Sequence, residues 1–217
     1  MIPKKMVRMV QGNLLLACIL CVAVAGCGPI GRFVNSEEPY RTEDYQGAFE
    51  RWTREARIYR GFDMELIVSA TFKSADYRRT YAKEYAKTYI LSDEDELKFE
   101  QDQLKAAAEF HDFVMTASIP DDKWNDFEKK DSIWKVYLTN EANDRISPVE
   151  IRKLNRKDPT IAQFFPYVSP WRRVYSLRFP VTIPERGTAF IGPDTHSITL
   201  TVTGVRGTCE MSWKLGD

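Results

Sequence analysis

The first 27 residues constrain this chain more than any other part of its sequence. An apolar run from Leu14 to Val24 is followed by small residues and preceded by three basic ones, Lys4, Lys5 and Arg8. This order of basic, apolar and small residues is typical of a secretory signal peptide. Residues 14–26 make a run of 13, whereas a transmembrane helix needs about 20 apolar residues. The sequence therefore favours a cleaved signal over a permanent membrane span.

The four residues that close this stretch, Val24-Ala25-Gly26-Cys27, resemble the lipobox of bacterial lipoprotein signal peptides. In that family the signal is cleaved before the cysteine, the thiol is diacylated and the new amino terminus is acylated. The resemblance implies that residues 1–26 are removed and that Cys27 is the lipidated first residue of the mature protein. Attachment by more than one acyl chain is stable. Two alternatives stay open, namely a membrane span and a plain secreted protein cut near Ala25.

The residue after the cysteine bears on location in the envelope. In Gram-negative lipoproteins an Asp at this position tends to retain the protein in the inner membrane, and this chain has Gly28 there. The resemblance therefore implies a protein anchored in the outer membrane and facing the periplasm, with the lipid bilayer as its partner through acylated Cys27. This resemblance covers only the first 28 residues and implies no activity for the rest of the chain.

Charge and cysteine content exclude several other classes of protein. The chain has 31 basic and 31 acidic residues, and removal of the signal leaves 28 basic against 31 acidic. The mature part thus has no excess of positive charge with which to bind nucleic acid. Cys18 and Cys21 lie in the signal, and acylation of Cys27 would leave Cys209 without a disulfide partner. Cys209 lies on the apolar phase of a predicted strand, so we expect a packed thiol.

The mature part divides into a tether and one domain. Residues 27–41 contain several Gly and Pro residues with little periodicity, which predicts the lipidated cysteine followed by a flexible tether. Residues 42–217 are long enough for a single globular domain with its own core. Because no internal disulfide is expected, that core must depend on apolar packing, and 12% of the residues are aromatic.

Hydrophobic periodicity predicts an α+β fold. Apolar residues at three- and four-residue steps between Thr42 and Gly61 predict an amphipathic helix, and alternation from Met64 to Phe72 predicts the first strand. Ser74 and Ser92 each precede a helical pattern, which predicts a helical hairpin at residues 75–110. About seven or eight short strands in all predict an antiparallel β-sandwich, immunoglobulin-like, with an N-terminal helix and the helical hairpin inserted after the first strand.

Two groups of aromatic residues are candidates for a ligand or interface site. Tyr77, Tyr81 and Tyr85 stand four residues apart and share one helix face, which fits either packing on a sheet or ligand stacking. The stretch from Phe164 to Trp171 is dense in aromatic rings and contains two prolines, which predicts a stiff segment crossing from one sheet to the other. For the rings of this stretch, Trp171 included, a core position is favoured over a docking surface. We expect the nearby arginines, Arg172, Arg173 and Arg178, at a solvated edge.

The sequence contains no recognisable motif for catalysis or metal binding. The two histidines, His111 and His196, stand in no motif for nucleophilic catalysis, and no Cys or His pair has the spacing of a metal site. We expect no cofactor. Oxygen-bearing side chains gather around Trp124, but they lack the glycine and distal glutamate of a calcium loop, so we expect a solvated loop. These side chains are Asp121, Asp122, Asn125 and Asp126.

These patterns leave three functions open. The leading hypothesis is a non-enzymatic accessory or interaction module of the cell envelope, in contact with other envelope proteins. A small-ligand carrier would use an aromatic-lined pocket beside Tyr77, and an envelope hydrolase would use a pair of distant carboxylates. Exposed aromatic residues outside a filled core would favour the first, an enclosed apolar cavity the second, and a cleft with two close carboxylates the third.

Overall fold

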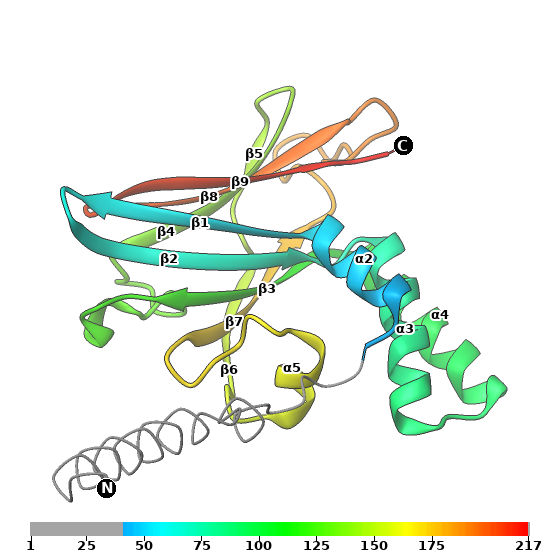
Figure 1. The fold of residues 1–217 in the computed structure, drawn as a ribbon. Helices are drawn as coiled ribbons and strands as arrows, with labels where there is room; N and C mark the ends of the chain where they lie inside the picture. The colour runs from blue at the N-terminus through cyan, green and yellow to red at the C-terminus, as the bar shows by residue number, and fades with distance from the viewer. Residues whose placement is uncertain (1–40, 217) are drawn as a thin grey trace, which may run out of the picture. The chain divides into compact units, whose positions relative to one another are not determined.

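The computed structural model describes residues 41–216, which form nine strands and four α-helices. The strands make two antiparallel sheets, of order β1-β2-β3-β7-β6 and β5-β4-β8-β9 (Figure 1). The predicted α+β class with antiparallel sheets is therefore confirmed. The five-stranded sheet contains β1 (Thr53–Arg60), β2 (Asp63–Phe72), β3 (Phe110–Ser118), β7 (Arg173–Pro180) and β6 (Glu150–Leu154). The four-stranded sheet contains β5 (Arg145–Ile146), β4 (Trp134–Asn140), β8 (Ser197–Gly204) and β9 (Gly207–Lys214).

A core of aromatic and aliphatic side chains lies between the two sheets. Phe113 on β3 contacts Phe179 on β7 and Trp213 on β9, with ring centroids 5.7 and 5.3 Å apart. Because Trp213 comes from the four-stranded sheet, these contacts hold the two sheets together. Full burial of a side chain such as Phe stabilises a fold by about 1.5–3 kcal/mol.

The central strand β3 is buried on both of its faces. Met115 lies in the core between the sheets, and Val114, whose side chain points the other way, is also buried. Tyr167 covers this second face, and its hydroxyl donates a hydrogen bond to the Val114 carbonyl at 2.7 Å. Phe49 of α2 (Glu43–Trp52) stacks on Tyr167 with ring centroids 5.7 Å apart. The five-stranded sheet thus carries a second aromatic layer on its outer face.

The edge strands β1 and β9 meet and close one side of the structure. The Nε atom of Arg54 donates a hydrogen bond to the Ser212 carbonyl at 3.0 Å, and the indole N–H of Trp213 donates to the Trp52 carbonyl at 2.8 Å. At Gly207 the approach is so close that an added Cβ would lie 2.6 Å from Cγ2 of Ile58. This contact and a φ of +133° require glycine at the start of β9.

The predicted first helix is too long, because α2 ends at Trp52 and the chain continues as β1. Ala56 and Tyr59 match the helical spacing, but they belong to a strand that pairs with β2 in antiparallel register. Residues 54–60 also alternate in a way that fits a strand, with buried Ile58 opposite in orientation to exposed Tyr59. Gly61, with a φ of +62°, makes the turn of this hairpin rather than the end of a helix.

Two helices occupy the region in which the helical hairpin is expected. They are α3 (Ala75–Tyr89) and α4 (Asp93–Glu109), and the side chains of Ser74 and Ser92 cap their amino ends. The pair lies between β2 and β3, directly after the strand predicted from Met64 to Phe72; this strand is the second and not the first, because the sequence pattern predicts a helix over the residues of β1. Figure 1 shows α2, α3 and α4 grouped at the end of the sheets where β2 ends.

The predicted crossing between sheets is also placed wrongly. The stretch from Phe164 to Trp171 connects β6 to β7, which are neighbours in the same sheet, through α5 (Pro159–Phe164) and an irregular segment. The chain crosses between the sheets at three other places, from β3 to β4, from β5 to β6 and from β7 to β8, and the crossing from β5 to β6 takes only residues 147–149. Pro148 lies in this crossing, and the backbone N–H of Val149 already bonds to Arg178 of the new sheet at 2.8 Å.

Cys27, the predicted lipidation site, and most of the predicted tether lie outside the described residues. The last residue of the predicted tether is not free, because Nε of Arg41 donates a hydrogen bond to the Gln163 carbonyl at 2.8 Å. Within residues 41–216, no helix is both long enough and apolar enough to cross a membrane.

Candidate functional site

The tyrosine row on α3 is part of a packed aromatic cluster. Tyr77 is completely buried, and Tyr81 and Tyr85 pack on Phe164 of α5, with ring centroids 5.0 and 5.7 Å apart. Tyr85 also stacks on Phe99 of α4 at 4.4 Å. These contacts fill the space beside the row, so the structure favours packing over ligand stacking for these three residues.

Hydrogen bonds fix the buried end of this cluster. The hydroxyl of Tyr45 donates to the Phe164 carbonyl at 2.6 Å and lies 2.7 Å from the hydroxyl of Tyr77. Burial raises the pKa of both phenols above the ordinary value, which keeps them neutral hydrogen-bonding groups at physiological pH. The role of these tyrosines is therefore structural.

Trp171 has a very different setting, because its side chain is 86% exposed. The core alternative for this residue is therefore wrong. The next residue, Arg172, is fixed on the five-stranded sheet: its Nη1 donates to the Ser69 hydroxyl at 2.8 Å and approaches a Glu55 oxygen at 3.4 Å. Arg172 is thus not a freely solvated edge residue, and it holds the backbone that presents Trp171.

The side chains next to Arg172 form a surface that we call the β1–β2 outer face, defined by Glu55, Arg57, Tyr59 and Ser69. Arg57 pairs with Glu55 at 2.7 Å, and Tyr59 is 55% exposed. Although partial burial acts to raise it, hydrogen bonds from Arg57 and Ser69 and the charge of Arg172 lower the pKa of Glu55 below its ordinary value. The result is a fixed charged network, with the exposed ring of Tyr59 on the same strand as Glu55 and the exposed Trp171 next to Arg172 in the chain.

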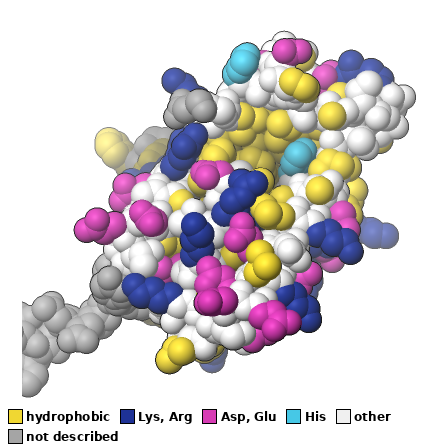
Figure 2. Space-filling model, turned by 90° about the vertical axis from the view of Figure 1, so that its right-hand side faces the viewer, with side chains coloured by type: hydrophobic (Ala, Val, Ile, Leu, Met, Phe, Trp, Pro, Cys, Tyr) yellow, Lys and Arg dark blue, Asp and Glu magenta, His cyan; other side chains and the backbone are white. Residues whose placement is uncertain are grey.

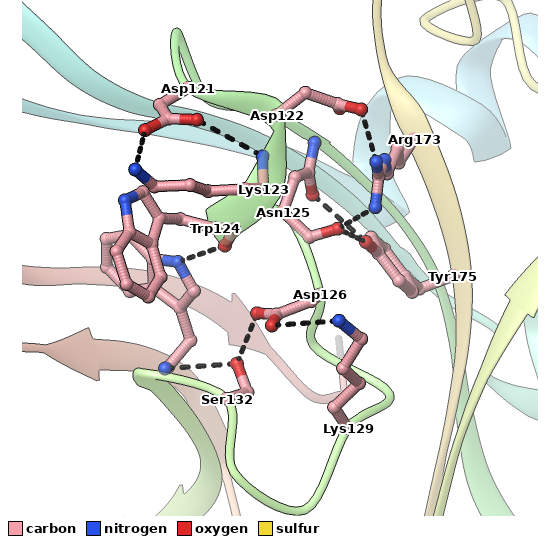
Figure 3. A network of polar contacts seen from close by, with 11 residues as sticks. Asp121, Asp122, Lys123, Trp124, Asn125, Asp126, Lys129, Ser132, Arg173 and Tyr175 are labelled. Atoms are coloured by element: carbon pink, nitrogen blue, oxygen red, sulfur yellow. Dashed lines mark hydrogen bonds and ion pairs between the residues drawn. The ribbon is translucent and has the colours of Figure 1, made fainter.

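The oxygen-rich loop around Trp124 is held by contacts within the protein (Figure 3). Asp122 pairs with Arg173, and the Ser132 hydroxyl donates to Asp126 at 3.0 Å. Figure 3 also shows the hydroxyl of Tyr175 at Asn125, where it donates to the side-chain oxygen at 3.0 Å. The buried part of the loop, Asn125 and Asp126, thus braces β3, β4 and β7, whereas the side chains of Asp121 and Asp122 are 45% and 70% exposed, as expected for a solvated loop.

A buried ion pair lies on the helix side of β3. Arg78 of α3 is 1% exposed and its Nη2 contacts Asp112 at 2.7 Å, while Nε of Arg178 contacts the other carboxylate oxygen at 3.0 Å. Burial lowers the pKa of Arg78, and the charge and hydrogen bond of Asp112 oppose that shift. This pair fixes α3 to the sheet.

Next to this ion pair, at the end of the sandwich where β2 ends and β3 begins, lies a cavity of about 230 Å³ that we call the mouth cavity. Its walls are mainly apolar and come from β2 and β3 of the five-stranded sheet, from both long helices, from the loop before β8 and from the segment after β9. Figure 2 shows hydrophobic side chains gathered in a hollow on this face, with a histidine beside it. The principal residues are Phe72, Lys73, Phe110, His111, Ile191 and Leu215.

His111 is the polar group in this cavity whose hydrogen bonding is incomplete. Its Nε2 atom is buried and has no hydrogen-bond partner among the described residues. Its ring lies against Phe72 and Phe190, with centroids 6.2 and 6.0 Å away. Burial lowers the pKa of His111 to about 4, so the imidazole is neutral at physiological pH.

The sequence contained one signal for this cavity. His111 shares the strand parity of Phe113 and Met115, so alternation along β3 places all three on the face toward the four-stranded sheet. The other walls, such as Ile191 and Leu215, come from loops and chain ends, for which no sequence pattern predicts a common location.

Within the described residues, neither the thiol of Cys209 nor any group of His, Cys, Asp and Glu side chains forms a reactive or metal-binding site. Cys209 is buried on β9, and burial raises its pKa to about 11, as expected for a packed thiol. Among residues 41–216, no group of three or more His, Cys, Asp and Glu side chains is arranged to hold a metal ion.

Comparisons with known proteins assign no activity to the chain. No family model and no curated protein matches it. One solved structure, described as a novel protein of unknown function from Burkholderia pseudomallei, is similar over 77% of this chain and 80% of its own, with a TM-score of 0.36 and 12% sequence identity. A similarity of this degree carries no argument about function.

Proposed function

We propose that this protein is a lipid-anchored component of the cell envelope that faces the periplasm from the outer membrane and acts as a non-enzymatic interaction module. The lipobox that ends in Cys27 supports the anchor and the location. The interaction role rests on one observation, namely that Trp171 is 86% exposed beside a fixed network of charged residues.

An exposed indole costs free energy, because it leaves a large apolar area in contact with water. Trp, Tyr and Arg supply much of the binding energy at protein interfaces, because each combines a large apolar area with hydrogen-bonding or charged groups. All three residue types occur here. Tyr59 and Arg57 belong to the β1–β2 outer face, and Trp171 precedes Arg172, which is bonded to that face. Since Arg172 is already bonded to Ser69 and Glu55, this surface is arranged before a partner binds.

A photo-crosslinking amino acid with a large aromatic side chain, in place of Trp171, keeps an exposed ring at this position and tests the interaction role in living cells. We expect it to capture an envelope protein that also co-purifies with the wild type and is lost from Trp171→Ala. The matched control is the same amino acid at Ile90, which is 91% exposed on the turn between α3 and α4. Identical captured proteins at both positions, or none at position 171, would contradict the proposal.

Replacement of the lipobox cysteine tests the anchor separately. We expect Cys27→Ala to leave the domain folded, as judged by circular dichroism, and to abolish incorporation of labelled acyl chains. If the Cys27→Ala variant still associated with membranes at high salt, the lipid anchor would be contradicted. The interaction role of Trp171 would still be decided by its own test.

A small-ligand carrier is the second candidate. The tyrosine row does not support it, because that cluster is filled, but the mouth cavity does. No observation favours a carboxylate-based hydrolase. The immunoglobulin-like character suggested by the sequence is a further proposal about the sandwich and implies no activity of its own, because one fold supports many functions.

A further inference from the structure

We propose that the free edge of β4 binds an extended acidic segment of a partner protein, which adds to the four-stranded sheet as a further strand. Alternate residues of that segment place apolar side chains in a groove beside β4 and acidic side chains on the outer face of the sheet. The inference concerns a different surface from the β1–β2 outer face, and it does not depend on acylation of Cys27.

The edge of β4 that faces away from β8 is only partly paired. β8 pairs with β4 along its whole length, but β5 pairs with it only at Leu138 and Thr139. The residue that would continue this second ladder, opposite Val136, is Pro148. Proline has no backbone N–H to donate, and the chain leaves the sheet there for β6. Among the described strands, residues 134–137 therefore have a neighbour on one side only.

The backbone of Val136 presents two hydrogen-bonding groups at this free edge. The N–H of Asn140 donates to the Asp144 carbonyl at 3.1 Å, so Asn140 directs its backbone groups toward β5. Residues two and four positions away along a strand direct theirs to the same side. The N–H of Trp134 is already bonded there, to the Ser132 hydroxyl at 3.2 Å. The N–H and C=O of Val136 have no such partner within the described part of the chain, and an added strand can bond to both.

A groove of about 300 Å³ lies beside this edge, between β4 and β6, and it determines half of the partner's side chains. Its lining includes the apolar residues Phe127, Trp134, Val136 and Ile151. The side chain of Val136 points inward and is buried. A partner residue paired with Val136 points to the same side of the sheet and so enters the groove. Alternate residues of the partner segment are therefore apolar and of moderate size, such as valine.

The charges around the groove favour an anionic partner. Three lysines and two glutamates line it, and Arg145 lies beside it. Lys130, Lys135 and Arg145 are exposed and form no ion pair among the described residues. Of the two glutamates, Glu150 approaches an arginine of β7 at 4.0 Å, which leaves Glu128 against three cations. The balance of uncompensated charge is thus positive.

Two of these cations lie where the other half of the partner's side chains would be. Lys135 and Tyr137 alternate with Val136, so their side chains lie on the outer face of the sheet. The guanidinium of Arg145 is held on the same face, 4.7 Å from the centre of the Tyr137 ring. Opposite charges on neighbouring strands attract, and like charges destabilise the pairing. A second copy of this edge would bring its own Lys135 and Arg145, so the charges favour an acidic segment over a homodimer.

Fluorescence anisotropy with synthetic peptides tests the proposal on the full-length protein in detergent micelles. The probe is a peptide of alternating Val and Glu, and the matched peptide alternates Val and Lys. We expect the Val–Glu peptide to bind at least tenfold more tightly. Methylation of its Val nitrogens removes the N–H groups that face β4 and is expected to weaken binding about tenfold. Methylation of its Glu nitrogens, which face away from β4, is the control.

Two variants and one exchange measurement locate the site. Lys135→Glu combined with Arg145→Glu reverses the charges beside the edge and is expected to reverse the preference in favour of the Val–Lys peptide. The matched control is Lys214→Glu, at an exposed lysine of β9 in the same sheet, which should keep the wild-type preference. Bound Val–Glu peptide is also expected to slow hydrogen exchange at the backbone N–H of Val136.

Several outcomes would overturn the proposal. Equal binding of the two methylated peptides would show that no strand adds to β4 and that charge alone attracts the peptide. An unchanged preference in the charge-reversed variant would place the site elsewhere. Self-association of the wild type that the Val–Glu peptide dissociates would identify a second copy as the occupant. If the charge-reversed variant fails to fold, the methylated peptides and the exchange of Val136 in the wild type still decide the question.

Discussion

The hydroxyl groups of Tyr45 and Tyr77 lie 2.7 Å apart inside the aromatic cluster between α2, α3 and α5. Tyr45 uses its single proton for the Phe164 carbonyl at 2.6 Å, so Tyr77 must be the donor between the two hydroxyls. One chain of hydrogen bonds thus joins three helices that are distant in sequence. This chain gives the first prediction.

Tyr45→Phe is expected to destabilise the protein more than Tyr77→Phe. Loss of the Tyr45 hydroxyl leaves both the Phe164 carbonyl and the Tyr77 hydroxyl without a partner, at about 1–3 kcal/mol for each buried group. Tyr77→Phe removes one donor and leaves the bond to Phe164 intact. Urea unfolding measures the difference. Tyr89→Phe, at a 45% exposed ring, is the control, and a loss equal to that of Tyr45→Phe would contradict the assignment.

Asp112→Asn is expected to be among the most destabilising single substitutions. It leaves the buried guanidinium of Arg78 without its counter-charge, and breaking a buried ion pair in this way reduces the free energy of unfolding by about 3–5 kcal/mol. The comparison is Glu100→Gln, which removes a partially exposed partner of Arg79 at 3.9 Å. Chemical denaturation of both variants checks the contrast, and equal stability of the two would show that Asp112 is not needed as a charge.

Gly207→Ala is expected to weaken the closure between β1 and β9. The added Cβ would meet Ile58 and would also require a φ of +133°, which L side chains rarely adopt. Strain of this kind reduces stability by about 1–3 kcal/mol. The control is Gly192→Ala, where an added Cβ comes no closer than 4.0 Å to the Thr195 hydroxyl. Thermal unfolding of the two variants should therefore differ. In a double-mutant cycle, Gly207→Ala should cost less in an Ile58→Ala background than in the wild type, by the part due to the clash.

His111 is expected to contribute a loss of stability in acid. Burial lowers its pKa from 6.5 to about 4, so between these values the unfolded chain binds a proton that the folded protein does not. The free energy of unfolding therefore falls as the pH drops through this window, by roughly 3–4 kcal/mol at most from this group.

Urea unfolding at pH 7 and at pH 4.5 measures this contribution. The wild type is expected to lose more stability between the two pH values than His111→Phe does, because the variant has no imidazole to protonate. His196→Gln, at the exposed histidine, is the control for removal of a histidine. Equal losses in the wild type and His111→Phe would show that His111 is not the group responsible.

Local patterns in the sequence predicted several elements because neighbouring residues alone decide them. Ser74 and Ser92 each cap a helix, and Leu200 and Val202 alternate with polar residues along β8. The boundary between α2 and β1 could not be predicted in this way. The residues after Trp52 fit a helical period, but they find partners on β2 and on β9, the latter more than 150 residues away.

In the candidate sites too, some features depend on neighbouring residues and others on residues that are distant in the sequence. The sequence alone could not choose between packing and stacking for Tyr81, because Phe164 and Phe99, which fill the space around it, come from other elements. It also favoured a core position for Trp171, since the density of rings nearby is typical of a core. In the structure, Arg172 anchors on the sheet and leaves Trp171 outside.

Taken alone, the sequence determined the short apolar segment that ends near Cys27 and the alternation that places His111 on the inward face of β3. The lipobox, and with it the absence of a disulfide partner for Cys209, stays a prediction. Only the tertiary structure decided that His111 meets Ile191 and Leu215 around one cavity. The reason is physical: signals and periodicity depend on residues a few positions apart, whereas burial, lost hydrogen bonds and shifted pKa values depend on segments brought together from across the chain.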